Sequence, residues 1–272
     1  MSYLQLEKYA QGYIRLMDES TKNGHNVNVS TITLLCTLSV PKVDIQGFTN
    51  NFHEEGVTVK ISKNNKQFEL TKRGKVKKTF FNQVTLNYFD ISNKSIKVFS
   101  NGKLQITGIS SCYECHHVIG LITTWLNREN VSDPISVTDA YFGMLNVNFS
   151  VKYCLDLALL NRHLNMNENV MSVYNPETYP AINMKLQLSP GEYMCSTKTN
   201  KNISIFVFGT GNIVITGGKC IEAVSEAYNF IVGKISKTSE VLLRANIIPS
   251  VKKTDKYFHG YKIKQYLSCV DK

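Results

Sequence analysis

The sequence lacks the patterns that direct a chain into a membrane or out of the cell. It has no signal-peptide pattern and no apolar run long enough to span a bilayer. Its seven cysteines are odd in number and scattered, so they do not make a paired disulfide framework. We therefore expect an intracellular protein with reduced thiols and no membrane partner.

Catalytic motifs are also missing. There is no P-loop, no G-x-G-x-x-G loop and no paired-carboxylate motif. Residues 112–117 read C-x-x-C-H-H, which is similar to half of a zinc site or to a haem attachment motif, but no second C-x-x-C or H-x-x-x-H accompanies it. We interpret this stretch as part of a helix, and we expect no enzyme activity, no metal, no cofactor and no small-molecule substrate.

Acidic residues are few compared with basic ones. The chain has 31 Lys and Arg but only 21 Asp and Glu, which gives a net charge of +10. Such an excess favours a polyanionic partner such as nucleic acid, but a proteome that is simply rich in lysine gives the same composition. Charge alone leaves both interpretations open.

The chain does contain one sequence motif that occurs twice. Residues 98–108 read VFSNGKLQITG and residues 207–217 read VFGTGNIVITG, with identical residues recurring 109 positions apart. Phe99 matches Phe208, and Thr107 matches Thr216. So many identities at one offset indicate a duplicated unit, and each copy predicts two strands joined by a tight glycine turn.

Alternation along these strands sorts the side chains onto two faces. One face is aliphatic and is expected to be buried: Ile96, Val98, Leu104 and Ile106 in the first copy, and Ile205, Val207, Ile213 and Ile215 in the second. The other face is mixed: Lys97, Phe99, Lys103, Gln105 and Thr107, then Phe206, Phe208, Asn212, Val214 and Thr216. A helical pattern follows each hairpin, at about 110–128 and 218–237. These helices can cover the aliphatic faces, so the mixed faces should meet a partner.

These patterns predict an α+β fold with two pseudo-symmetric halves. We expect a helical N-terminal extension at 1–26, repeats at 27–130 and 131–237, and a basic C-terminal extension at 238–272. Residues 62–94 and 187–202 read as expansions, the first a lengthened hairpin with a basic tip at 72–75. The tail mixes lysines with aromatic residues, which is compatible with nucleic-acid binding or with packing.

The repeat resembles the TATA-box-binding protein family, which also consists of two repeats. GKLQITG and GNIVITG are similar to the family's GK-x-V-x-TG hairpin, YNPETYP at 174–180 to its YEPELFP, and STITLLCTL at 30–38 to its STVNLGCKL. The resemblance covers roughly residues 26–237. The divergence and the richness in Asn, Lys and Ile favour a relative carried by a large DNA virus.

The resemblance implies a curved antiparallel sheet whose concave face lies in the DNA minor groove, with helices on the convex face. It implies a transcription initiation factor that binds and bends A·T-rich promoter DNA and recruits a B-type initiation factor and RNA polymerase. The protein would then work in the nucleus or, if viral, in a cytoplasmic virus factory or virion. The alternative is a protein–protein scaffold in transcription that keeps the fold but has lost strong TATA binding.

The resemblance also implies roles for individual residues. Phe99, Phe208 and Tyr179 match aromatic wedges that enter base steps, and the TATA-box-binding protein is itself a standard example of such wedging. Thr107, Thr216, Val214 and Val29 match small residues of the reading surface, and Lys60 and Lys185 match basic positions aimed at phosphates. Lys97, Lys103 and Gln105 share the mixed face and complete the predicted DNA-binding set.

The sequence also departs from the family. Gln105 replaces a valine of the reading surface, Lys97 stands where an aliphatic residue is expected, and Glu54 falls where the first repeat should have a wedge. In the predicted partner surface Glu177 keeps an acidic residue, while Asn175 and Thr178 replace an acid and a leucine. We therefore expect a second repeat suited to the minor groove, an altered first repeat and a modified partner surface.

Overall fold

The computed structural model describes residues 3–61, 82–90, 92–128, 134–166, 170–189, 194–195, 198–199, 202–238 and 242–245. Its helices are α1 (Tyr3–Lys22), α2 (Ile45–Asn51), α3 (Cys112–Asn127), α4 (Leu157–Leu164) and α5 (Ile221–Lys237). The large sheet consists of β1 (Asn28–Leu38), β2 (Val57–Ile61), β3 (Gln83–Phe89), β4 (Asn93–Phe99), β5 (Lys103–Ile109), β6 (Val137–Ser150), β8 (Val170–Val173), β9 (Ala181–Gln187), β12 (Asn202–Phe208) and β13 (Asn212–Gly218). Two short pairs join β7 (Tyr153–Leu155) to β14 (Leu242–Ala245) and β10 (Met194–Cys195) to β11 (Lys198–Thr199).

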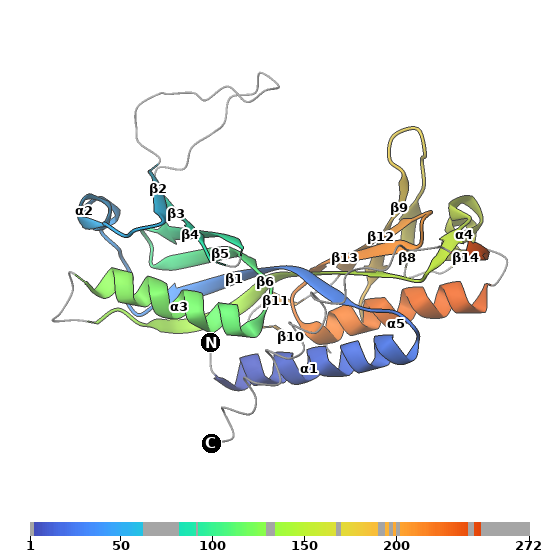
Figure 1. Ribbon diagram of the computed structural model, residues 1–272, viewed down its shortest axis with the longest axis horizontal. Helices are drawn as coiled ribbons and strands as arrows, with labels where there is room; N and C mark the ends of the chain where they lie inside the picture. Colours follow the sequence, from blue (N-terminus) through green and yellow to red (C-terminus); the bar gives the residue numbers. More distant parts are fainter. Residues whose placement is uncertain are drawn as a thin grey trace. The chain divides into compact units, whose positions relative to one another are not determined.

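The large sheet is antiparallel and confirms the expected α+β class. Its strand order is β2-β3-β4-β5-β1-β6-β13-β12-β9-β8, so the elements of one half recur in mirrored order in the other (Figure 1). The chain divides into two compact units. The first holds Thr33–Ile109 and Cys115–Ala140, and the second holds Ser2–Ile32, Ser110–Glu114 and Tyr141–Lys272. The boundary therefore falls inside the long strands β1 and β6 rather than in a linker.

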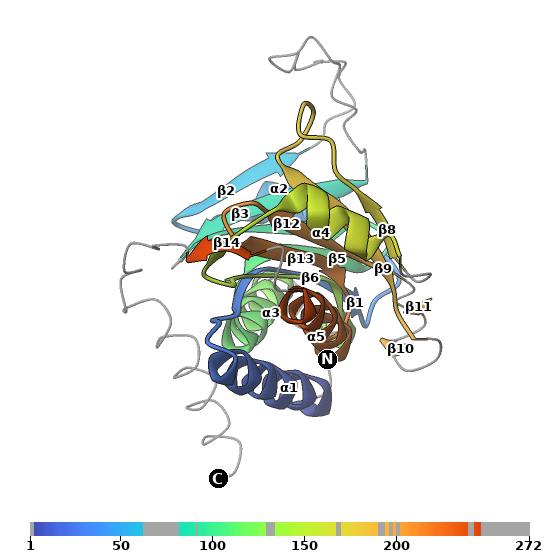
Figure 2. The same cartoon turned by 90° about the vertical axis from the view of Figure 1, so that its right-hand side faces the viewer.

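In the first unit, the hairpin of β4 and β5 buries its aliphatic face as predicted. Ile96, Val98 and Ile106 are fully buried, and Leu104 is nearly so. The helix α3 contributes Trp125, whose ring lies 6.0 Å from that of Tyr88 on β3. This contact places the helix over the buried side of the strands (Figure 2).

The start of α3 is held by reciprocal capping. The Ser111 hydroxyl accepts a hydrogen bond from the Glu114 backbone N–H at 3.2 Å, and the Glu114 carboxylate accepts one from the Ser110 backbone N–H at 2.7 Å. These bonds satisfy donors that the first turn of a helix leaves unpaired. The C-x-x-C-H-H stretch lies in this helix, where Cys115 is buried. Among the described residues, no group of three His, Cys, Asp or Glu side chains could hold a metal ion.

In the second unit, α5 packs against the corresponding hairpin of β12 and β13. Ile205, Val207, Ile213 and Ile215 are fully buried, again as predicted. The helix supplies Val224, Ala227, Tyr228 and Ile231 to the same core. The two hairpins thus sort their side chains in the same way, which is the structural counterpart of the repeat.

The N-terminal helix α1 is part of the second unit and packs on α5 (Figure 1). At Gly12 the helices approach so closely that a Cβ atom would collide with the Ile221 side chain. Beyond the helix, the Tyr228 hydroxyl accepts a hydrogen bond from Asn23 at 3.3 Å and lies 2.9 Å from Nδ1 of His25. Burial raises the pKa of Tyr228, whereas burial and then the charge of Lys152 lower the pKa of His25.

The described parts of the predicted expansions contain strands. In the first expansion, residues 83–89 and the start of β4 are strands of the large sheet, and β2 and β3 pair as the two arms of a hairpin. The basic tip at 72–75 lies outside the described residues. Within the second expansion, β10 and β11 pair as a short hairpin. Part of the C-terminal extension, β14, pairs with β7 and so belongs to the second unit. No helix among the described residues is long and apolar enough to cross a membrane.

Candidate nucleic-acid interface

The turn of each repeated hairpin contains a glycine, and a phenylalanine ends the strand that leads into this turn. Gly102 and Gly211 have φ values of +70° and +80°, a conformation that favours glycine. A Cβ atom would collide with the carbonyl oxygen of Val40 at the first position and of Tyr153 at the second. The two glycine N–H groups donate to the carbonyl oxygens of Phe99 and Phe208 at 3.1 and 2.9 Å. Both predicted wedge residues therefore stand at the last position of a strand whose turn is fixed.

Side chains along each strand alternate between the buried face of the sheet and the opposite face, which we call the open face. In the second unit, strand pairing sets a row of side chains across this face, which we call its central row: Asn148, Val214, Phe206, Asn183 and Val173. Asn148, Asn183 and Val173 are exposed, and Val214 and Phe206 are partly exposed. The neighbours of Phe206 along its strand, Ile205 and Val207, are buried.

Next to the central row lies a second row, called here the threonine row. In the second unit it contains Thr216, Ser204, Lys185 and Met171. Lys185 is exposed at the surface, as expected for a basic residue aimed at phosphates. The Thr216 hydroxyl donates a hydrogen bond to the side-chain oxygen of Asn146, which fixes both polar groups at this surface.

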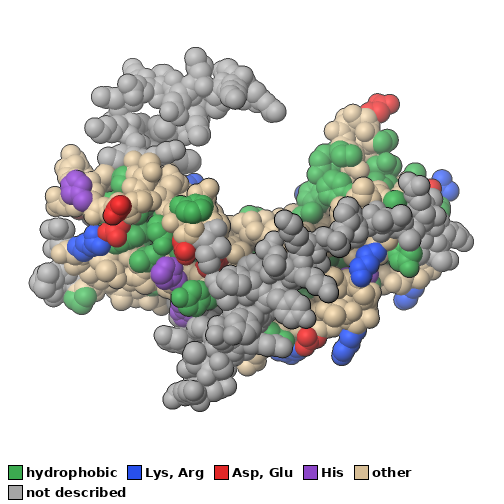
Figure 3. All heavy atoms as spheres, viewed as in Figure 1, with side chains coloured by type: hydrophobic (Ala, Val, Ile, Leu, Met, Phe, Trp, Pro, Cys, Tyr) green, Lys and Arg blue, Asp and Glu red, His purple; other side chains and the backbone are tan. Residues whose placement is uncertain are grey.

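Aromatic rings gather at one end of the open face of the second unit. The Tyr179 ring centroid lies 6.0 Å from that of Phe206 and 6.3 Å from that of Phe208. Tyr179 is 44% exposed, so this cluster is accessible to a partner. Hydrophobic side chains gather over the part of the unit that carries β8, β9 and β12 (Figure 3).

The open face of the first unit is more polar. Its central row contains Gln105, Lys97 and Thr85, and by backbone register Lys60, whose side chain lies outside the described part. Its threonine row contains Thr107, Ser95, Asn87 and Thr58. Lys103 is exposed, and its amino group donates to the Thr37 hydroxyl at 2.8 Å. The described rows of both units contain lysines and no carboxylate, a balance that suits a polyanion.

Two expectations about individual residues are wrong. Val29 was assigned to the reading surface, but it is 3% exposed and belongs to the core, whereas its neighbour Ser30 is exposed. The alternation of buried and exposed side chains along β1 shifts by one residue between Val29 and Ile32. A face assigned by counting from one end of the strand is therefore wrong at the other end. Glu54 was placed at the missing wedge position, but its carboxylate pairs with Arg128 at 2.6 Å, beside the end of α3.

Strand register also shows which segments correspond in the two units. β3 pairs with β4 as β9 pairs with β12, with Gln83 opposite Phe99 and Ala181 opposite Phe208. The counterpart of Tyr179, two residues before Ala181, is therefore the residue two before Gln83. That residue is Phe81, which lies outside the described residues. The first repeat thus has an aromatic residue at the equivalent sequence position, which the alignment to Glu54 missed.

Sequence reasoning also left Phe206, Asn183 and Asn148 out of the candidate site. Each lies in the central row of the second unit, in register with Val214 or with one another. Alternation had placed Phe206 on the mixed face, and the offset of 109 residues pairs it with Lys97. Asn148 carries a different signal, because NVNFS at 146–150 repeats NVNVS at 26–30 at another offset, whereas Asn183 carries none.

The exposed turn between β8 and β9 carries the predicted partner residues. The Asn175 side chain accepts a hydrogen bond from the Glu177 backbone N–H at 3.2 Å, and its carbonyl oxygen accepts bonds from the backbone N–H groups of Thr178 and Tyr179 at 3.1 and 3.0 Å. Asn175 therefore shapes the turn, and Glu177 and Thr178 project from it in exposed positions. The same turn sets the direction in which Tyr179 enters the aromatic cluster.

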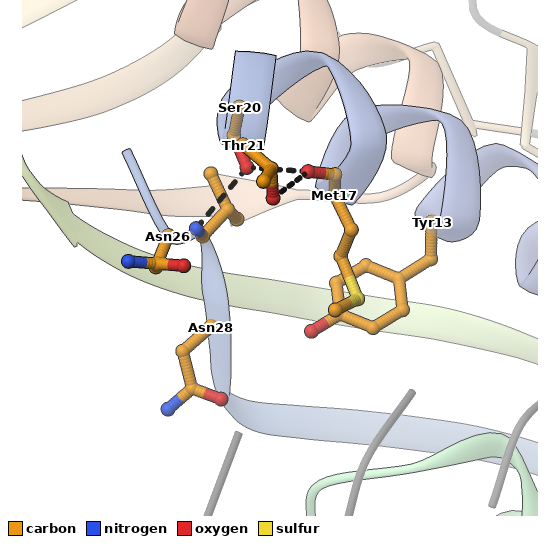
Figure 4. A pocket seen from close by; sticks show the side chains of 7 residues that line it. Tyr13, Met17, Ser20, Thr21, Asn26 and Asn28 are labelled. Carbon is orange, nitrogen blue, oxygen red and sulfur yellow. Dashed lines mark hydrogen bonds between the residues drawn. The ribbon is translucent and has the colours of Figure 1, made fainter. Parts of the chain in front are cut away.

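A small crevice lies between α1 and the start of β1 (Figure 4). Tyr13, Met17 and Asn28 line it, and the Ser20 hydroxyl in its wall donates to the Met17 carbonyl oxygen at 2.9 Å. Its volume of about 30 Å³ suits a water molecule or two rather than a ligand. It is part of the packing of α1 and not a second candidate site.

The fold and these surfaces define a class: a duplicated α+β protein with open sheet faces of polar and aromatic residues. Comparisons with known proteins name a family that part of the chain resembles. Residues 142–238 match the family described as Transcription factor TFIID (or TATA-binding protein, TBP). Over residues 142–238 the chain is therefore similar to the TATA-box-binding protein family, a family of transcription factors and not of enzymes. The matched segment is the second repeat, which is also the half whose central row carries Val214 and Phe206.

Individual relatives agree. A TATA-box-binding protein-like protein of Acanthamoeba polyphaga mimivirus is 29% identical over 96% of this chain and 78% of its own length. TATA-box-binding protein 2 of Haloferax volcanii is 26% identical over 51% of this chain and 66% of its own length. Among solved structures, Methanococcus jannaschii TBP matches 78% of this chain and 98% of its own with a TM-score of 0.50 and 16% identity, which supports the fold.

Proposed function

We propose that this chain is a transcription initiation factor that binds promoter DNA through the minor groove, bends it, and recruits a B-type initiation factor and RNA polymerase. The observation that carries the proposal is the exposed aromatic cluster of Tyr179, Phe206 and Phe208 at the end of an open face. Rings in such a position can enter a base step, and the unstacking they cause brings more protein surface into contact with the bent duplex.

The surface beside the cluster suits A·T pairs. The minor groove over A·T presents only acceptors, so a reading surface needs apolar side chains and a few donors. Val214 supplies the first kind and Asn148 supplies the second, in paired positions on the same face. Lys185 is exposed in the neighbouring row, where it can neutralise a phosphate.

The exposed turn supports the proposal of a protein partner. Glu177 and Thr178 stand at its surface while Asn175 fixes its shape. An acidic side chain in a fixed and exposed turn suits a basic patch on an initiation factor. Because Asn175 and Thr178 replace an acid and a leucine, we propose that the factor is one adapted to this chain.

Binding to A·T-rich and G·C-rich duplexes over a series of salt concentrations tests the proposal, with donor and acceptor dyes at the duplex ends to report bending. We expect tighter binding to the A·T-rich duplex, an end-to-end distance that shortens on binding, and loss of both with Phe208→Ala. Met166→Ala, an exposed apolar side chain beyond the end of α4 that lies in neither row of the open face, is the matched control and should change binding little. Equal affinity for both duplexes without bending would refute the proposal.

The second candidate is a protein–protein scaffold of transcription that has lost strong TATA binding. One observation favours it: the central row of the first unit holds Gln105 and Lys97 where the second unit holds Val214 and Phe206. A scaffold predicts weak binding that falls steeply with salt and ignores sequence. The same duplex series therefore separates the two candidates.

The site of action is also a proposal. The mimivirus relative supports a viral source, which would place the protein in a cytoplasmic virus factory or in the virion rather than in the nucleus. Immunofluorescence in infected cells tests this: co-localisation with viral DNA in the cytoplasm supports it, and a purely nuclear signal contradicts it.

A further inference from the structure

The two units differ in one row of their open faces and agree in the next. In the threonine row, Thr107 and Ser95 of the first unit correspond to Thr216 and Ser204 of the second, in the same register. In the central row, Gln105 and Lys97 correspond to Val214 and Phe206. The first unit therefore keeps the side chains of the threonine row and differs in the central row, where polar side chains replace apolar ones.

The central row matters because of the hydrogen-bonding groups that the bases present in the minor groove. A·T and T·A pairs show acceptors only, whereas a G·C pair adds the exocyclic amino group of guanine, a donor. An apolar side chain packed against this amino group leaves its hydrogen bond unmade, which costs free energy. A carboxamide such as that of Gln105 can accept from guanine through its oxygen or donate to adenine and thymine through its nitrogen.

We propose that Gln105 makes the first unit tolerant of G·C pairs, so that the preferred DNA site is asymmetric: one half restricted to A·T by Val214, the other open to G·C. This inference rests on the minor-groove function proposed above and adds its sequence preference. Lys97 lies opposite Gln105 on the adjacent strand and is partly exposed. Its charge attracts phosphates irrespective of base, which makes the first unit less dependent on sequence still.

Three duplexes test the inference: one with A·T in both halves, one with G·C in a single half, and one with G·C in both. The protein can bind the mixed duplex in either direction, so the G·C half is free to lie under the first unit. We expect the mixed duplex to bind within about threefold of the A·T duplex, and the G·C duplex to bind on the order of tenfold more weakly, as one lost hydrogen bond implies.

Two exchange variants give matched controls, because each installs the residue found at the equivalent position. Gln105→Val should weaken the mixed duplex by about tenfold relative to the A·T duplex. Val214→Gln should strengthen the G·C duplex by a similar factor. Replacing guanine by inosine in the mixed duplex removes the amino group alone, and it should abolish the difference between the wild type and Gln105→Val.

The outcomes separate this inference from the function it rests on. If the wild type binds the A·T duplex well but loses about tenfold on the mixed one, and Gln105→Val changes nothing, the inference is wrong and minor-groove binding stands. If the wild type neither bends nor prefers A·T in any duplex, the proposed function fails and the inference fails with it. If inosine leaves the effect of Gln105→Val intact, a contact other than the amino group is responsible, which also overturns the inference.

Discussion

Replacing Phe208 by alanine should separate DNA binding from folding. Phe208 is partly exposed at the end of β12, and its described ring contact is the one with Tyr179 at 6.3 Å. An aromatic pair contributes about 0.5–1.5 kcal/mol, so we expect a stability loss near 1 kcal/mol. That corresponds to a fall in melting temperature of roughly 2–4 °C. A central wedge in a DNA interface should contribute more, about 2 kcal/mol, or roughly a 30-fold rise in Kd.

The matched control lies three residues away on the same strand. Ile205 is fully buried beneath α5, and Ile205→Ala should cost about 2–5 kcal/mol of stability through the cavity it leaves. At a temperature where both variants remain folded, its Kd for DNA should stay near that of the wild type. Differential scanning fluorimetry and fluorescence anisotropy with an A·T-rich duplex measure the two quantities. A large stability loss in Phe208→Ala with unchanged Kd would show that the ring belongs to the core and would refute the reasoning.

Three further predictions concern other parts of the molecule. Lys185→Ala should reduce the slope of log affinity against log salt by about 1, since one phosphate contact is lost, and an unchanged slope in a salt titration would exclude that contact. Phe99→Ala should weaken DNA binding in anisotropy and leave the melting temperature nearly unchanged, and a marked drop in melting temperature would show a core role. Because burial lowers the pKa of His25 below its unfolded value, the folded state resists protonation, and the unfolding free energy should fall as the pH drops below about 6.5. In chemical denaturation from pH 7.5 to 5, the unfolding free energy of His25→Gln should decline less steeply than that of the wild type. Some decline should remain, because the pKa of His116 is lowered too. An identical decline in both proteins would contradict this assignment.

The repeated hairpins were predictable because their physics is local. Alternation places Ile205 and Val207 in the core and Phe206 on the open face, and the glycine of each turn fixes the pairing of the two strands. The positions of α3 and α5 followed in the same way from helical periodicity after each hairpin. These features need no information from distant parts of the chain.

Features that depend on distant contacts were less accessible. Val29 reads as a surface residue if the alternation of the first strand is constant, but the burial pattern changes phase before Ile32. Glu54 would stand at a wedge position if β2 were the counterpart of β9. The strand pairing instead makes β3 the counterpart of β9, because β9 pairs with β12 as β3 pairs with β4. The long segment before Gln83 hides this correspondence in the sequence. The central row, with Asn148 and Asn183, also emerges only when five strands are placed side by side.

The claim on which the functional account depends is that the open faces read DNA from the minor groove. Inosine–cytosine pairs test it most directly, because they carry the minor-groove groups of A·T and the major-groove groups of G·C. In an anisotropy titration, we expect an A·T duplex and its inosine–cytosine counterpart to bind with the same Kd and with the same bend. If the inosine–cytosine duplex binds as G·C does, the protein reads the major groove or no sequence at all, and the account is contradicted.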